Sequence, residues 1–151
     1  MRGGLPWLRS GPLYRVSDDA LILLDAFLAE HPYRRIDLYG SVMVSRDAAH
    51  EELHRAFDFP DWCGNNWDAF NDCFGHFVHD NDGALLAVVW RDVPAAAAAA
   101  PVTTAEVGWA LLQCAFGEMP SLGPGATWSI TLDVFALGQG PDFDGPEEVD
   151  V

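Results

Sequence analysis

The chain has 151 residues, half of them apolar, so it is long enough for one domain with a buried core and is unlike a disordered chain. It carries 23 acidic residues against 8 basic ones, all of them arginine, and its formal net charge is -15. This charge argues against nonspecific binding to nucleic acid or to an anionic membrane, and it favours either a cationic partner or simple solubility.

Three cysteines, Cys63, Cys73 and Cys114, lie in apolar or aromatic stretches. Because their number is odd and their surroundings are apolar, we expect reduced, packed thiols in a cytosolic protein. Cys73, His76 and His79 are spaced three apart on an expected helix, but zinc sites usually add a second tight pair of ligands, which the other cysteines do not supply. We therefore expect no metal and no other cofactor.

Neither a secretory signal nor a membrane-spanning segment is visible in the sequence. The first residues lack an uninterrupted apolar region and a small-residue cleavage pattern. The apolar run at 20–24 is far too short to span a bilayer. A cytoplasmic location is therefore the expectation.

The spacing of apolar residues and the turn residues predict strands that alternate with helices. In chain order, the expected elements are a short strand at 13–16, a helix capped by Ser17 and stopped by Pro32, a strand within 34–44, a helix capped by Ser45 and ended by Pro60, a loop at 61–64, a helix at 66–79, a strand at 84–93, a helix from 103 to about 119 and a last strand at 127–137. Residues 1–12 are expected to be loose, the alanine run at 95–100 fits a helical turn and a linker equally well, and the acidic tail from Gly138 is expected to be disordered. This alternation indicates an α/β fold with a parallel sheet.

The helix expected at 66–79 has two different faces. One carries an aromatic stripe that must be buried, made of Trp67, Phe70, Phe74 and Phe77. Toward the other side lie Asp68 and Asp72, one turn apart, and like charges at that spacing cost a few tenths of a kcal/mol. No Lys or Arg occurs from residue 56 to residue 90, so sequence neighbours do not compensate the pair. The two acids are either solvated groups on a polar face or counter-charges for another protein.

The segment 57–74, "FDFPDWCGNNWDAFNDCF", resembles the signature of the barstar family, intracellular inhibitors of secreted ribonucleases. The family pattern sets Pro, an acid, aromatics, Gly, Asn, Asp, Ala, Asp and Cys in a fixed order, and the resemblance extends from about residue 35 to residue 137. It implies a small three-stranded parallel sheet with flanking helices, to which an N-terminal extension at 1–34 could add a fourth strand. The domain organisation expected is that extension, a barstar-like domain at 35–137 and a disordered acidic tail at 138–151.

The resemblance also implies roles for individual residues. Asp68 and Asp72 match the family acids that face the phosphate-binding cations of the enzyme. Trp62 matches an aromatic loop residue that packs on the enzyme, and an acid late in the third helix has its nearest counterpart in Glu118. His76 departs from the usual small residue, and Asn71 stands where an aromatic is often found. The complete set of partner-binding residues implied in this way is Trp62, Asn65, Asp68, Asn71, Asp72, Gly75, His76, Phe77 and Glu118.

Three hypotheses about function follow. The first is a binding protein, monomeric when free, that blocks the active site of a basic ribonuclease in a 1:1 complex by imitating RNA phosphates. The second keeps the fold but changes the partner to another basic protein, such as a different toxin or a nucleic-acid-binding protein. The third is an enzyme with Asp68 and Asp72 as an acid and base pair, which is disfavoured because both project from one convex helix.

The remaining aromatic residues divide between surface and core. Trp62 is expected to be exposed because it lies in a loop beside Gly64. Trp90, Trp109 and Trp128 lie on expected strands or helices and are predicted to be in the core.

Overall fold

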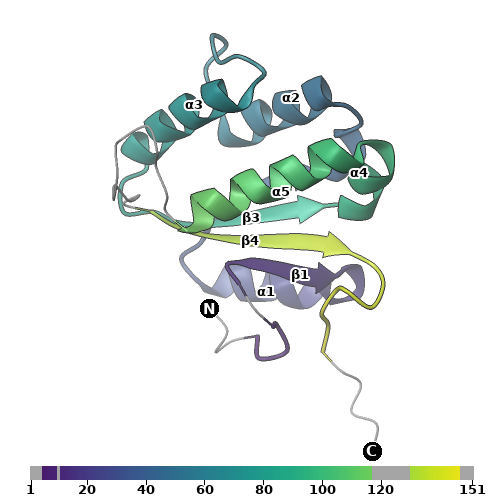
Figure 1. Cartoon of the computed structure of the whole chain (residues 1–151). Coiled ribbons are helices and arrows are strands. Elements are labelled where there is room, and N and C mark those ends of the chain that lie inside the picture. Colours follow the sequence, from purple (N-terminus) through teal and green to yellow (C-terminus); the bar gives the residue numbers. More distant parts are fainter. Residues whose placement is uncertain (1–4, 10, 117–129, 147–151) are drawn as a thin grey trace, which may run out of the picture.

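A four-stranded parallel sheet organises the computed structural model, which describes residues 5–9, 11–116 and 130–146 (Figure 1). Its strands are β1 (Leu13–Ser17), β2 (Arg34–Tyr39), β3 (Leu85–Arg91) and β4 (Thr131–Gly138). They lie in the order β1-β4-β3-β2, and every neighbouring pair is parallel. The α/β fold with a parallel sheet is confirmed, and the fourth strand comes from the N-terminal extension.

The helices cover the two faces of the sheet unequally, as Figure 1 shows. α1 (Leu21–Glu30) lies on one face. On the other face lie α2 (Arg46–Phe57), α3 (Trp67–Asp80), α4 (Val93–Ala99) and α5 (Pro101–Phe116). Short 3-10 turns, η2 (Asp18–Ala20) and η3 (Gly40–Val42), precede α1 and follow β2. α1 therefore lies on the face of the sheet opposite the helices that carry the proposed partner-binding residues, whereas β1 of the extension also contacts α5.

The central strand β3 is buried on both faces because its side chains alternate between two cores. Leu86, Val88 and Trp90 point into the core beneath α2, α3 and α5, whereas Ala87 and Val89 point into the core beneath α1. Trp90 is only 2% exposed, so its predicted core position is confirmed. This burial on both faces explains why the sequence of β3 is almost entirely apolar.

The N-terminal extension is attached to the sheet by ring stacking and a buried hydrogen bond. Tyr14 of β1 stacks on Phe135 of β4, with ring centroids 5.4 Å apart. The hydroxyl of Tyr33 donates a hydrogen bond of 2.8 Å to the Asp133 carboxylate. Burial, reinforced by that carboxylate, raises the pKa of Tyr33 above its usual range. The extension and the strands at the centre of the sheet thus share one core.

The acidic tail lies along the outer edge of β1. The Asp144 amide donates to the Arg15 carbonyl at 2.8 Å, the Ser17 amide donates to the Asp144 carbonyl at 2.7 Å, and the Arg9 guanidinium pairs with the Asp144 carboxylate at 2.8 Å. The composition predicts disorder from Gly138 onward, but residues 139–146 follow the edge of the sheet. They can do so because an edge strand offers backbone hydrogen-bond partners, which require no apolar side chain. Residues 147–151 lie outside the described part of the chain.

Two local ambiguities of the sequence are settled by the structure. The alanine run forms most of α4, which begins after Asp92 and buries Ala96. The strand expected within 34–44 ends at Tyr39, because the chain turns at Gly40, where a Cβ would lie 2.5 Å from the carbonyl oxygens of Arg91 and Asp92. Among the helices described, none is both long enough and apolar enough to cross a membrane.

Candidate functional site

An aromatic stripe fixes the orientation of α3. Phe70 and Phe74 stack at 5.8 Å, Phe74 and Phe77 at 5.6 Å, and each of the three meets the ring of Phe57 edge-on. At the helix start, the Asn66 side chain accepts a hydrogen bond of 2.8 Å from the Ala69 amide, which caps the first turn. Because one side of α3 is buried in this way, the opposite side must face solvent.

Asp68 and Asp72 lie on the solvent side of α3, and both are exposed. Neither takes part in any ion pair among residues 5–9, 11–116 and 130–146. The arginines that form ion pairs do so with other acids: Arg9 with Asp144, Arg35 with Asp25 and Asp37, Arg55 with Glu52, and Arg91 with Asp37. The extension lies across the sheet and does not cover them (Figure 1).

The two acids interact differently with the helix dipole because they lie at different positions on α3. Asp68 belongs to the first turn, where the helix dipole favours a carboxylate by about 0.3–1 kcal/mol. Asp72 is one turn deeper, where that benefit fades, and at the i,i+4 spacing the two Cβ atoms lie roughly 5–6 Å apart. The pair therefore presents two close negative charges to solvent at a small cost to the free protein.

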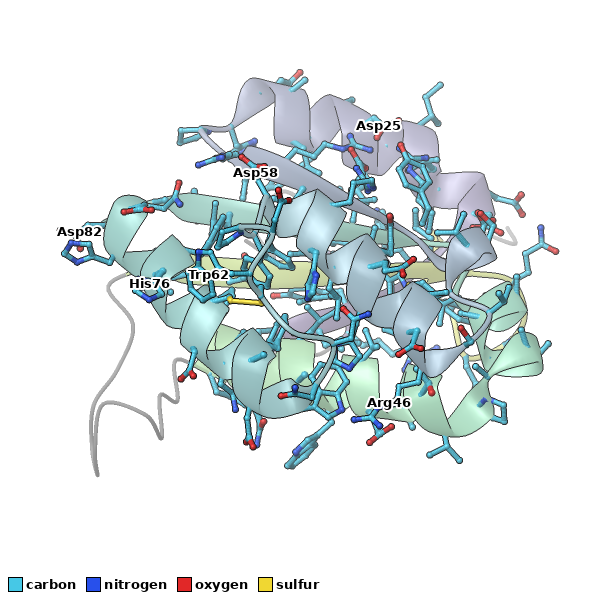
Figure 2. All side chains as sticks on the ribbon, turned by 90° about the horizontal axis from the view of Figure 1, so that it is seen from above. Asp25, Arg46, Asp58, Trp62, His76 and Asp82 are labelled. Atoms are coloured by element: carbon cyan, nitrogen blue, oxygen red, sulfur yellow. A yellow bond between two sulfur atoms is a disulfide. The ribbon has the colours of Figure 1, made fainter. Side chains whose placement is uncertain are left out.

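The loop before α3 extends the exposed face. Trp62 is 68% exposed, as expected, and its ring meets the ring of His76 edge-on with centroids 5.9 Å apart. Figure 2 shows these two side chains together, whereas Arg46, the first residue of α2, lies well apart from them. Asn65 and Asn71 are exposed and Gly75 is partly exposed. Loop and helix thus form one continuous surface.

A disulfide joins this loop to α3, which corrects the prediction of reduced thiols. Cys63 and Cys73 are bonded, with Cα atoms 6.5 Å apart and a sequence separation of 10 (Figure 2). The prediction was wrong because an odd number of cysteines does not show which two the fold brings together, and here the loop folds back over the second turn of the helix. Cys114 is free and buried, and burial raises the pKa of its thiol.

Of the implied partner-binding residues, Phe77 is buried and Glu118 has no described position. Phe77 is only 7% exposed and packs in the core, and it reaches the surface only as part of the wall of a recess of about 320 Å³ that His76 also lines. Glu118 lies outside the described residues. The exposed face, called here the α3 face, consists of Trp62, Asn65, Asp68, Asn71, Asp72, Gly75 and His76.

Sequence reasoning missed one feature beside the α3 face. Trp109, predicted to be in the core, is 63% exposed, and Val102 is 73% exposed. The buried residues of α5 are Thr104, Val107, Leu111 and Cys114, and Trp109 falls on the opposite side of that helix. The 3.6-residue period of the buried positions is the signal that could have identified it.

The part of the chain that the structure describes shows no arrangement typical of a metal centre. Over the described ranges, no three His, Cys, Asp or Glu side chains are grouped so that they could hold a metal ion. Of the three residues considered from their spacing, Cys73 is bonded to Cys63. The chemistry available at the α3 face is therefore that of carboxylates, amides and aromatic rings.

Comparison with known protein families identifies one match. The family model described as Barstar (barnase inhibitor) matches residues 33–116, which is more than half of the chain. It covers β2 to α5 and therefore the whole α3 face, and it leaves out β1, α1 and β4. A search of curated proteins found no significant match.

Proposed function

The chain belongs to the barstar family, whose members are inhibitors and not enzymes, and we propose that it inhibits a basic ribonuclease by inserting the α3 face into the active site of that enzyme. In this complex, Asp68 and Asp72 take the place of RNA phosphates. Trp62 packs against the rim of the enzyme's cleft, and the proposed stoichiometry is 1:1.

Asp68 and Asp72 are exposed and form no ion pair with any described residue, and this observation carries the proposal. A ribonuclease must hold phosphate, so its cleft presents Arg, Lys and His side chains. Carboxylates one helical turn apart can meet such cations through charge-assisted hydrogen bonds, which are the strong ones once water is excluded. The net charge of -15 would also attract a basic enzyme over a distance and speed the encounter at low salt.

The proposed location of the protein is the cytoplasm, where an inhibitor would protect the cell before its ribonuclease is exported. The Cys63–Cys73 disulfide weighs against this part of the proposal, because cytosolic thiols are generally kept reduced. Alkylation of freshly lysed cells, followed by mass spectrometry of the peptides that contain Cys63 and Cys73, tests it. Free thiols fit the cytoplasm, and an intact disulfide points to an oxidising compartment.

Titration calorimetry against basic ribonucleases of the secreted type, combined with an RNA-cleavage assay, tests the function. We expect tight binding, loss of RNA cleavage, and association that slows as salt rises. Asp72→Ala should weaken binding more than Asp68→Ala, because Asp72 lies deeper in the exposed face. The general cost of leaving a desolvated charge unpaired is about 2–5 kcal/mol, a range that rests in part on measurements within this family.

The matched control is Asp19→Ala, which changes the net charge equally but lies with the extension, in η2. It should leave affinity nearly unchanged. If no basic ribonuclease binds, or if Asp72→Ala binds like the wild type, the proposal fails. Binding of a basic protein that has no ribonuclease activity would favour the second hypothesis, a barstar-fold protein with a different partner.

A further inference from the structure

A groove of about 670 Å³ runs between α3 and α5, directly beside the α3 face. From α3 it is lined by Trp67 and Asn71, and from α5 by Val102, Glu106, Trp109 and Gln113, among others. Asn71 belongs both to this groove and to the α3 face. A partner seated on Asp68 and Asp72 would therefore meet the groove as well.

Exposed apolar side chains make this groove unusual. Val102 is 73% exposed and Trp109 is 63% exposed, and because they are seven positions apart they share one side of α5. That helix is already anchored by Val107, Leu111 and Cys114 on its opposite side, so its packing does not require an apolar outer face. Contiguous exposed apolar surface on a folded domain marks an interaction site more often than chance.

The charges around the groove restrict what it can bind. Among the described residues, Glu106 is the one charged residue that lines it, and Asp68 and Asp72 lie on the neighbouring turns of α3. Neither α3 nor α5 contains a Lys or an Arg. A second copy of the chain would bring like charges together at this place, and like-charge contacts oppose association. An apolar side chain with basic neighbours satisfies both the apolar wall and the acidic rim.

We propose that the α3–α5 groove is a second docking position for the same basic ribonuclease, and that it takes an aliphatic or aromatic side chain flanked by Arg or Lys. This rests on the proposed function and adds to it. The acids of α3 then supply charge complementarity, whereas the groove supplies apolar surface. Aromatic residues that become buried at an interface contribute much of its binding energy.

Two substitutions test the groove by affinity, measured with the same ribonuclease as Asp72→Ala. Trp109→Ala and Val102→Ser should each weaken binding, Trp109→Ala by about tenfold or more, in the manner of a buried aromatic at an interface. The controls are Ile22→Ser, at an exposed apolar position of α1 across the sheet, and Phe116→Ser, at an exposed position of α5 that does not line the groove. Both controls should bind like the wild type, and circular dichroism checks that every variant is folded.

A labelling experiment gives a readout independent of affinity. Val102→Cys introduces an exposed thiol, while Cys114 is buried and the other two cysteines are bonded. A maleimide should label this variant rapidly in the free protein and at least about tenfold more slowly when ribonuclease saturates it. Ile22→Cys should be labelled at the same rate in both states.

The outcomes separate this inference from the proposed function. If Asp72→Ala loses binding but Trp109→Ala and Val102→Ser do not, the groove proposal is overturned and the inhibitor function stands. Slow labelling of Val102→Cys in the free protein would mean that the chain itself or a second copy fills the groove, and sedimentation would distinguish these two; either result overturns the proposal. If no ribonuclease binds at all, both proposals fall.

Discussion

Breaking the Cys63–Cys73 disulfide should destabilise the protein by an amount that follows from the loop it closes. The bond joins residues 10 apart in the sequence, and closing a loop of that size removes about 2.7 kcal/mol of conformational entropy from the unfolded chain at 25 °C. Domains of this size are stable by about 5–15 kcal/mol, so the loss is a large fraction of the total. With a urea dependence of about 1–3 kcal/mol per molar, the unfolding midpoint should fall by roughly 1–3 M.

Urea unfolding followed by tryptophan fluorescence, with and without dithiothreitol, measures this effect. The double variant Cys63→Ala and Cys73→Ala should match the reduced wild type and should not respond to the reductant. Cys114→Ala should keep the full response, because Cys114 is free. If mass spectrometry shows an intact disulfide and the midpoint nevertheless does not move on reduction, the entropic reasoning is refuted; three titratable thiols in the unfolded, untreated protein would refute the disulfide itself.

Three further predictions concern the folded protein. His50 is 1% exposed with neither ring nitrogen hydrogen-bonded to any described residue, and burial, helped by Arg46, lowers its pKa; the unfolded chain therefore takes up the proton first, and stability should fall as pH drops below about 6.5, a slope that His50→Leu reduces. Asp72→Asn should raise the unfolding free energy by a few tenths of a kcal/mol in a urea titration, because it relieves the repulsion from Asp68; a loss above about 1 kcal/mol would contradict this. Phe57 contacts four other phenylalanine rings, so Phe57→Ala should lower the unfolding free energy by about 3–5 kcal/mol in the same assay. Phe57→Leu should lower it by less, which checks that the lost side-chain volume is responsible.

The sequence was informative where a local pattern decides the structure. The aromatic stripe of α3 predicted its buried side, and the apolar run of β3 predicted a strand buried on both faces, because helix and strand periods act within one element. The exposure of Trp62 also followed from its own neighbours, a loop and a glycine. Each of these predictions needed no information about distant parts of the chain.

Sequence reasoning failed where distant segments meet. The Cys63–Cys73 bond depends on how a loop returns to its helix, and the order of residues 139–146 depends on backbone hydrogen bonds to β1, from the other end of the chain. The wrong prediction for Trp109 has a different cause. The helical period of the apolar positions excludes Trp109 from the buried side of α5, but the prediction gave more weight to the general preference of tryptophan for burial.

The energies of the acid pair are consistent with a role in binding rather than in folding. Asp68 and Asp72 make no ion pair anywhere in the described chain, and their repulsion costs the free protein only a few tenths of a kcal/mol. A desolvated partner cation could return about ten times that amount in the complex. α1 and its core lie on the far side of the sheet, so residues added at α1 can stabilise the domain without changing the α3 face. A surface that is slightly unfavourable alone, and is held in place by a disulfide and an aromatic core beneath it, therefore supports the proposal of a cationic partner.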